Sequence, residues 1–365
     1  MKIKQNKRPG FSRWTRAAGM LGAGGAAFFI GGLALAMPET ALHASLRGVA
    51  VWWDVLFPAL FPFFVLSELL LGFGIVHMTG TLLDPLMRPL FRLPGVGGFV
   101  VAMGFASGYP VGARLTSRLM EQGLLNGRQG ERLVFMTTTS DPIFLIGAVC
   151  IGFFGSSEAA PVLAIAHYGG ALTLGILTGF LDRSAVMSSE DDAAAGRGRL
   201  RAALAAMHRA RTADGRPFGL MLQQSVQSSL ALMMIVGGLV VFFSAALDLF
   251  VNSGSLSFVN QLTSGMLHVF GLPPDMGPSL VKGIFEVTLG AKAAASAAAS
   301  GMPLPMVDRI AAAAFVLSWA GLSVHAQVAG LMSRTRWRYA PFALFRLLHG
   351  AIAMFIVYLI WPLFF

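Results

Sequence analysis

The sequence predicts an all-α polytopic membrane protein built from two inverted-topology repeats, each with broken helices and a helical hairpin. Three observations support this fold class: long apolar runs with few charges, a motif that recurs later in the chain, and arginines gathered between apolar runs. Of the 365 residues, 55% are hydrophobic and 12% are charged. Soluble domains carry about 25% charged residues, so the composition excludes an ordinary soluble domain and indicates several membrane spans.

The formal net charge of +10 is explained by a membrane rather than by nucleic acid. The basic residues lie at the ends of apolar runs, where the positive-inside rule assigns them to the cytoplasmic face. The single cysteine, Cys150, cannot form an internal disulfide, and no Cys/His spacing typical of a metal site occurs. The HExxH, GxSxG, GxGxxG and Walker A patterns are also absent. We therefore expect no enzymatic activity, no cofactor, no metal and no nucleic-acid partner.

Residues 1–44 are predicted to form a basic cytoplasmic N-terminus and a first membrane helix. The stretch MKIKQNKRPGFSRWTR carries six Lys or Arg residues, and an apolar run over residues 17–37 follows it. A cleaved signal peptide is the alternative, because Ala34 and Ala36 form an A-x-A pattern. The apolar run is longer than the about 7–15 residues usual in signal peptides, which favours the membrane helix.

An internal repeat is the most informative feature of the sequence. The segment FRLPGVGGFVVAMG at residue 91 and the segment FGLPPDMGPSLVKG at residue 270 share the pattern F-x-L-P-x3-G-x5-G. The correspondence continues at an offset of 177 to 179 residues. It pairs Gly112-Ala113-Arg114 with Gly290-Ala291-Lys292, Glu131-Arg132 with Asp308-Arg309, and Ser140 with Ser318.

This offset defines repeat one over residues 45–182 and repeat two over residues 218–365. Residues 183–217 carry seven arginines and are predicted to be a cytoplasmic linker with a short amphipathic helix. Repeat one then begins outside and ends inside, whereas repeat two begins inside and ends outside. The region 80–132 has six arginines and the matching region 251–309 has three basic residues, as expected if two hairpins enter from opposite faces.

Apolar length predicts the individual spans, at about 20 residues per crossing. They are residues 17–37, 51–76, 133–155, 160–181, 219–250, 305–330 and 342–363. The segments 95–120 and 278–300 are apolar but interrupted, and each is predicted to be one arm of a hairpin. The segment LLDPLMRPLFRL is predicted to be interfacial, with Asp84 and Arg88 one helical turn apart. The segment SRTRWRYAPFALFR, which holds four arginines, is predicted to be the last inside loop.

The stretch GFASGYPVGARLTSRL is predicted to contain the tip of the first hairpin. Gly108 and Pro110 interrupt helical hydrogen bonding, so Ser107, Gly108, Tyr109 and Pro110 form an unwound segment with a helix starting near residue 111. Free backbone groups at membrane depth are tolerated against a cavity or inside protein. The helix N-terminus, the hydroxyls and Arg114 together suit an anionic group. The alternative is a proline kink with Arg114 reaching the inner interface.

The second copy of this stretch reads GIFEVTLGAK. Glu286 and Thr288 lie at the predicted break, and Lys292 replaces Arg114. A carboxylate inside an apolar segment is costly and usually functional or paired. Glu286 is therefore a candidate for proton or cation coupling. A structural salt bridge to Lys282 or Lys292 is the alternative.

A second pair of breaks is predicted farther along each repeat. In TTTSDPIFLIGAV, Ser140 and Asp141 precede a proline and an apolar run, which is a strong helix-start signal. Asp141 either caps that helix or lines the site. The counterpart SWAGLSVHAQV adds the polar residues Ser318, Ser323, His325 and Gln327. His325 is either a packed histidine or a site residue. Asp54 and Glu68 are weaker candidates near the two ends of one span.

These motifs carry a family resemblance. GYPVGARLTSRL, the run from ERL to SDPIFLIGAV, GIFEVTLGAK, GLSVHAQVA and RYAPFALFRLLHG together resemble the YlbJ/SpoVV family of sporulation integral membrane proteins, within the wider nucleoside-recognition (gate) group. The resemblance covers about residues 45–365. It implies a fold like that of concentrative nucleoside transporters, a location in the outer forespore membrane, and a role in moving dipicolinic acid during spore formation.

We therefore expect a secondary transporter of a small organic anion, with dipicolinic acid as the most specific candidate. Its partners would be the anion, a coupling ion (proton or sodium) and the bilayer of a cell membrane, with a homo-oligomer as a further expectation. Two alternatives remain: a transporter of nucleosides or other neutral polar solutes, and a non-transporting scaffold in spore envelope assembly.

Overall fold

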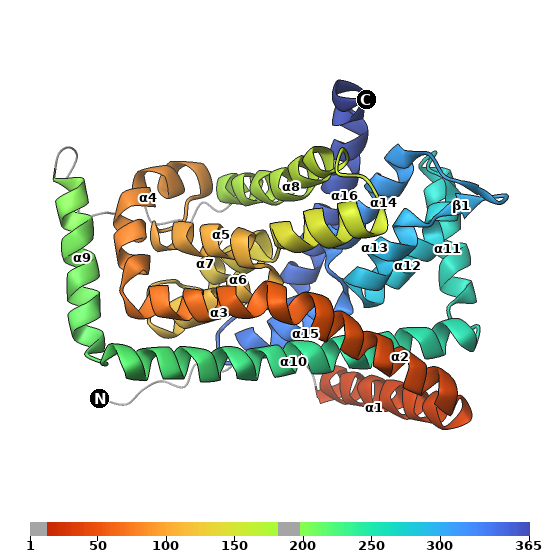
Figure 1. Cartoon of the computed structure of the whole chain (residues 1–365), viewed down its shortest axis with the longest axis horizontal. Coiled ribbons are helices and arrows are strands. Elements are labelled where there is room, and N and C mark those ends of the chain that lie inside the picture. Colours follow the sequence, from red (N-terminus) through yellow and green to blue (C-terminus); the bar gives the residue numbers. More distant parts are fainter. Residues whose placement is uncertain (1–12, 182–197) are drawn as a thin grey trace.

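The computed structural model describes residues 13–181 and 198–365, and nearly all of them lie in helices (Figure 1). The chain starts with α1 (Arg13–Ala36), whose end is followed by a sharp bend of 108° to the next helix. Large apolar side chains of α1 such as Phe28 and Leu35 are about 85% exposed. In an integral membrane protein such a face is suited to contact with lipid.

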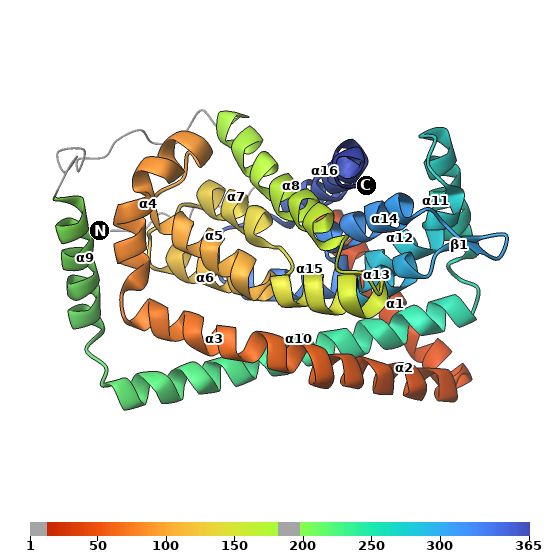
Figure 2. The same cartoon turned by 45° about the horizontal axis from the view of Figure 1, so that its top comes forward.

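Two long helical segments, one from each half of the chain, lie side by side and antiparallel (Figures 1 and 2). The first runs through α2 (Pro38–Val51), the π-helical turn η1 (Trp52–Leu56) and α3 (Phe57–Gly72), and the second is α10 (Phe218–Asn252). Glycines allow their close approach. A Cβ atom at Gly48 would lie 2.8 Å from the Cα atom of Val241, and one at Gly237 would lie 2.5 Å from the Trp52 ring. This pair joins the two halves of the protein.

After its long helix, each half presents its elements in the same order. The first half continues with α4 (Ile75–Phe91), α5 (Val96–Ser107), α6 (Tyr109–Glu121), α7 (Gly127–Thr137), η2 (Ile143–Phe153) and α8 (Ala160–Leu181). The second half continues with α11 (Ser257–Val269), α12 (Gly277–Phe285), α13 (Val287–Ala295), α14 (Met306–Trp319), α15 (Gly321–Met332) and α16 (Tyr339–Phe364). The order of elements therefore recurs as the sequence repeat predicts.

Smaller elements connect these helices. The short η4 (Pro274–Met276) precedes α12, and β1 (Ala298–Ala299) pairs antiparallel with β2 (Met302–Pro303) between α13 and α14. The linker contains α9 (Arg199–Asp214), which packs against α4. The rest of the predicted linker, up to residue 197, lies outside the described residues, as do residues 1–12 of the predicted basic N-terminus.

The segments 95–120 and 278–300, each predicted to be one arm of a hairpin, instead each contain both arms as a pair of short helices. In hairpin one (α5–α6), a Cβ atom at Gly112 would lie 2.5 Å from the Thr137 side chain on α7. In hairpin two (α12–α13), a Cβ atom at Gly290 would lie 2.3 Å from the Cα atom of Gly283. Gly112 and Gly290 are the residues that the repeat pairs. These equivalent glycines therefore allow different close contacts: Gly112 lets hairpin one approach α7, and Gly290 lets the two arms of hairpin two approach each other.

Several predicted boundaries are corrected by the structure. The helical segment that contains most of the expected span 51–76 starts earlier, at Pro38, and ends at Gly72, so the boundary at residues 44 and 45 falls inside α2. The expected span 133–155 is interrupted between α7 and η2, as the sequence signal at Asp141 indicates. Arg346, counted with an inside loop, lies within α16 and is fully buried.

Within the described residues, four helices are long and apolar enough to cross a membrane. They are Ala160–Phe180, Phe218–Asn252, Met306–Met332 and Tyr339–Phe364, and the number rises to six if each of two bent helix pairs counts as one span. These four match the expected spans 160–181, 219–250, 305–330 and 342–363. The structure is that of an all-α polytopic membrane protein.

The glycine contact of hairpin two gives a test of the fold. Gly290→Ala should destabilise the purified protein by about 1–3 kcal/mol, because the added methyl group meets backbone rather than a movable side chain. Thermal unfolding in detergent measures this loss. Gly238→Ala is the matched control, since a Cβ atom there meets nothing within 4 Å. Equal melting temperatures for the two variants would contradict the close helix contact.

Candidate functional site

The helix breaks of both halves come together in the interior. Hairpin one and hairpin two lie toward opposite ends of the long axis, with their tips toward the centre (Figure 1). At the first tip, α5 ends at Gly108, whose φ of +84° is a conformation that glycine adopts without strain. A Cβ atom at Gly108 would also lie 3.2 Å from Oδ2 of Asp141. A break at this position is present, but it is shorter than predicted: only Gly108 lies outside the helices, since Ser107 ends α5 and Tyr109 and Pro110 start α6.

A cavity of about 30 Å³ lies between these tips. Its wall contains half of the predicted site residues: Tyr109, Pro110, Asp141, Glu286, Thr288, Ser323 and Gln327. Apolar side chains such as Leu60, Phe144 and Val236 complete the wall. One buried water requires about 10–15 Å³ of such volume. The cavity therefore has room for a water or two or for a small ion, and an organic molecule needs the hairpins to move apart.

The two carboxylates of the cavity each cap a helix that starts at a break. Oδ1 of Asp141 accepts a hydrogen bond from the Phe144 backbone N–H at 2.8 Å. Oε2 of Glu286 accepts one from the Leu289 N–H, also at 2.8 Å. Both residues are at most 4% exposed, and neither joins an ion pair within the described part of the chain. Each carboxylate therefore caps a helix. The alternative considered for Glu286, a salt bridge to Lys282 or Lys292, is not formed.

His167 of α8 joins the serines that the repeat pairs. The Ser140 backbone N–H donates to Nε2 of His167 at 2.9 Å, and Nδ1 of His167 lies 2.8 Å from the Ser318 hydroxyl. Because a backbone N–H can only donate, Nε2 is the acceptor and Nδ1 carries the proton, so this imidazole is neutral. Tyr168 donates to the Ser140 carbonyl at 3.0 Å. Side chains therefore satisfy backbone groups that the breaks release, as an apolar surrounding requires.

Arg346 is a buried charge that the sequence analysis missed. Its Nη1 donates to the Phe135 carbonyl at 3.1 Å and to Nδ1 of His349 at 3.0 Å. His349 in turn donates from Nε2 to the His167 carbonyl at 2.7 Å, so His349 is also neutral. Nε and Nη2 of Arg346 have no hydrogen-bond partner within the described residues. Leaving a buried donor without an acceptor costs about 1–3 kcal/mol, and more for a charged group.

A sequence signal for Arg346 exists. An arginine and a histidine three positions apart, in an otherwise apolar run, fit the pattern of polar residues that face the interior of a membrane protein. The nearby arginines at positions 334, 336 and 338 conceal this signal, because together they resemble a positively charged loop.

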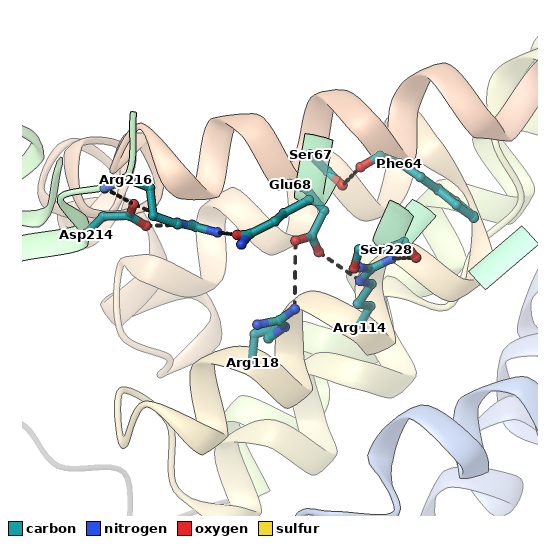
Figure 3. A network of polar contacts seen from close by, with 9 residues as sticks. Phe64, Ser67, Glu68, Arg114, Arg118, Asp214, Arg216 and Ser228 are labelled. Carbon is teal, nitrogen blue, oxygen red and sulfur yellow. Dashed lines mark hydrogen bonds and ion pairs between the residues drawn. The ribbon is translucent and has the colours of Figure 1, made fainter. Parts of the chain in front are cut away.

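Arg114 is not among the residues of the small cavity wall, and it joins a polar network instead (Figure 3). Its Nε lies 2.8 Å from Oε1 of Glu68 on α3, and its other nitrogens donate to the carbonyl and the hydroxyl of Ser228 on α10. Arg118 also approaches Glu68, with Nη2 3.8 Å from Oε2. Hairpin one is thereby attached to both long helices.

Four other predicted residues lie outside the cavity wall. Lys292 is exposed in the last turn of α13, and Ser107 is buried with its hydroxyl unpartnered within the described residues. His325 hydrogen-bonds through Nδ1 to the Tyr339 hydroxyl and through Nε2 to the Trp319 carbonyl, at 2.9 and 3.1 Å. Ser318 reaches the site through His167, as described above. A binding role for these residues stays a prediction.

A larger cavity of about 790 Å³ lies beside the Glu68 network. Side chains of α3, α6, α9 and α10 line it, among them Arg118, Arg209 and Gln224. Arg216 donates to both carboxylate oxygens of Asp214 (Figure 3), and this hydrogen bonding holds the pKa of Asp214 below its usual value. Small-molecule sites commonly occupy about 300–1,000 Å³. This cavity, which we call the vestibule, is therefore large enough for a small organic anion.

Comparison with known proteins decides the family. Sporulation integral membrane protein YlbJ of Bacillus subtilis is 40% identical over 333 residues, which cover 91% of this chain and 80% of that protein. The chain belongs to the YlbJ family of sporulation integral membrane proteins. A family model for nucleoside recognition, named Gate, matches residues 54–157, which include hairpin one and Asp141.

Other similarities are more limited. An uncharacterized protein of Alkalihalophilus pseudofirmus is 33% identical over 121 residues, covering 30% of this chain and 26% of that protein. No solved structure matches this chain. The expected membership of the YlbJ family is confirmed.

The Glu68–Arg114 pair provides a test of the polar network. Glu68→Gln should destabilise the protein by about 3–5 kcal/mol, because it leaves the buried Arg114 charge without its carboxylate. The double variant Glu68→Gln/Arg114→Gln should recover part of this loss in thermal unfolding. Arg338→Gln is the control: Arg338 pairs with Glu131 but is 69% exposed, and should cost about 1 kcal/mol or less. If the stability loss of the double variant equals the sum of the losses of Glu68→Gln and Arg114→Gln measured separately, a direct Glu68–Arg114 interaction is contradicted.

Proposed function

We propose that this protein is a secondary transporter of a small organic anion in a membrane of the sporulating cell. The observation that carries the proposal is the meeting of two hairpin tips and two further helix breaks around a small cavity with two buried carboxylates. In secondary transporters, substrate and ion sites lie near the membrane midplane between discontinuous helices of related repeats. A protein with a purely structural role has no need of four costly breaks.

We further propose that the two halves are inverted repeats in the manner of concentrative nucleoside transporters. The recurrence of element order supports this, as does the position of the hairpins toward opposite ends of the long axis (Figure 2). Under the positive-inside rule, α9 and the vestibule belong to the cytoplasmic side. Movement of one hairpin would then open the small cavity toward the vestibule, and movement of the other would open it toward the opposite face.

Asp141 and Glu286 are proposed to hold the coupling ion. Both carboxylates line one small cavity, and a buried carboxylate is costly in its charged form unless a proton or a metal cation neutralises it. The cavity volume suits a proton or a sodium ion. An anionic substrate that moves together with such a cation crosses the membrane with less net charge.

Dipicolinic acid is the most specific substrate candidate, and the outer forespore membrane is the proposed location. The family includes a protein named for sporulation, and a pyridine dicarboxylate would match basic side chains and helix N-termini. The second candidate is a nucleoside or another neutral polar solute. The Gate match is described as nucleoside recognition, and cavity carboxylates can accept hydrogen bonds from hydroxyl groups.

Uptake into proteoliposomes distinguishes these substrates. Vesicles that contain the purified protein and internal terbium should gain luminescence with external dipicolinate, because the ligand sensitises the metal. Saturable uptake that depends on a proton or sodium gradient would support the anion. Competition by uridine without competition by other carboxylates would favour the nucleoside, and the absence of flux with any of these solutes would favour a scaffold.

Variants of the two carboxylates test the coupling site. Asp141→Asn and Glu286→Gln should each lower gradient-driven uptake by roughly ten- to a hundredfold, since a hydrogen bond to a charged group contributes about 1.5–3 kcal/mol and about 1.4 kcal/mol is tenfold. Glu121→Gln, which changes an exposed carboxylate of hairpin one, should leave uptake unchanged. If all three variants transport like the original protein, these carboxylates do not hold the ion.

A further inference from the structure

The unpartnered nitrogens of Arg346 share one edge of the guanidinium group. Nη1 is occupied by the Phe135 carbonyl and by His349, whereas Nε and Nη2 have no acceptor within the described residues. The Nε–H and Nη2–H bonds of an arginine point in the same direction and form a planar fork. This fork matches the two oxygens of a carboxylate, which accept from it in parallel. The free edge is thus the one that recognises a carboxylate.

The occupied edge fixes the direction of the fork. Its acceptors belong to α7 and to α16 itself, and His349 is in turn held by the His167 carbonyl on α8. Both histidines are neutral, because each has one ring nitrogen that accepts a hydrogen bond, and an imidazole carries no negative charge that could balance Arg346. No carboxylate lies within 4.0 Å of Arg346 in the part of the chain that the structure describes. The guanidinium is therefore pre-oriented and lacks a counter-charge.

Two structural explanations fail for this residue. Arginines near helix ends commonly extend to the membrane interface, but Arg346 is 0% exposed. A connection between α16 and α7 needs only the Nη1 hydrogen bond, which a neutral amide could supply without burying a charge. The remaining donors have no structural task, and charged groups at membrane depth are functional by default.

Arg346 also lies close to the helix breaks. His349 and His167 connect it to Ser140 and Ser318, which flank the two broken spans. Tyr109, at the tip of hairpin one, lines the small cavity and donates from its hydroxyl to the Leu317 carbonyl at 2.9 Å, next to Ser318 in the chain. A ligand at Arg346 would therefore be connected to the helix breaks through this chain of hydrogen bonds.

We propose that Arg346 is the substrate-binding arginine, and that its Nε–Nη2 fork receives a carboxylate of an organic anion once hairpin one moves. Arg114, which sequence reasoning selected for this role, already has Glu68 as its carboxylate. The inference rests on the proposed transport function and specifies its substrate class as a carboxylate.

The test compares two ligands of the same shape and different charge. Dipicolinate and neutral pyridine-2,6-dicarboxamide are titrated against the purified full-length protein by isothermal calorimetry, and dipicolinate uptake is measured in parallel. The original protein should bind dipicolinate far more tightly than the dicarboxamide. Arg346→Gln should weaken dipicolinate binding by about 30-fold or more, with little change for the dicarboxamide, because one partner of a buried charge pair is lost.

Two further variants make the result decisive. Arg338→Gln removes an exposed arginine at the start of the same helix and should leave the preference for dipicolinate intact. If Arg346→Gln does not yield folded protein, Arg346→Lys replaces it: the charge remains but the two-donor fork is lost, and dipicolinate should bind at least about tenfold more weakly.

The outcomes separate the inference from the function. Uptake of dipicolinate with an unchanged ligand preference in the folded Arg346 variant would overturn the role of Arg346 and leave the transporter proposal standing. Absence of dipicolinate uptake and of any preference in the original protein would overturn both. We expect the Arg346 variant to lose the preference for dipicolinate over the dicarboxamide, and the original protein and Arg338→Gln to keep it.

Discussion

The need to satisfy backbone groups inside an apolar environment controls the centre of this structure. Helices that stop at membrane depth release N–H and C=O groups, and no water is present to bind them. Side chains from other segments meet this need: Asp141 and Glu286 cap the restarting helices, and His167 accepts from the Ser140 N–H. The polar residues of the core therefore have a structural task before any functional one.

Charge is distributed unevenly around these breaks. The two carboxylates share one small cavity, whereas Arg346 lies fully buried near the same breaks without a carboxylate partner in the described residues. Arg114 belongs to a separate network that attaches hairpin one to α3 and α10 (Figure 3). Buried ion pairs of the second kind stabilise an arrangement only while both partners remain. Separation of hairpin one from the long helices thus has to break the Glu68–Arg114 contact.

Local chain chemistry explains which breaks were predictable. The breaks at Gly108-Tyr109-Pro110 and Asp141-Pro142 are predictable from the sequence, because glycine and proline alter the backbone wherever they occur. Glu286 follows an ordinary apolar stretch, and its break was found only through its alignment with the first copy. The continuous helix from Pro38 to Gly72 was missed at its start, since Pro38 at a first helical turn resembles the loop that a proline often marks.

The sequence by itself determined that the protein is an all-α polytopic membrane protein, its family, the repeated order of elements, and half of the residues around the central cavity. These follow from composition, periodicity and local backbone signals, which act over a few residues. Only the tertiary structure decided where each charge goes. Arg114 meets Ser228 across 114 positions and Arg346 meets Phe135 across 211, so their partners depend on how distant helices pack. A side chain of several rotatable bonds can reach in many directions, and packing alone selects one of them.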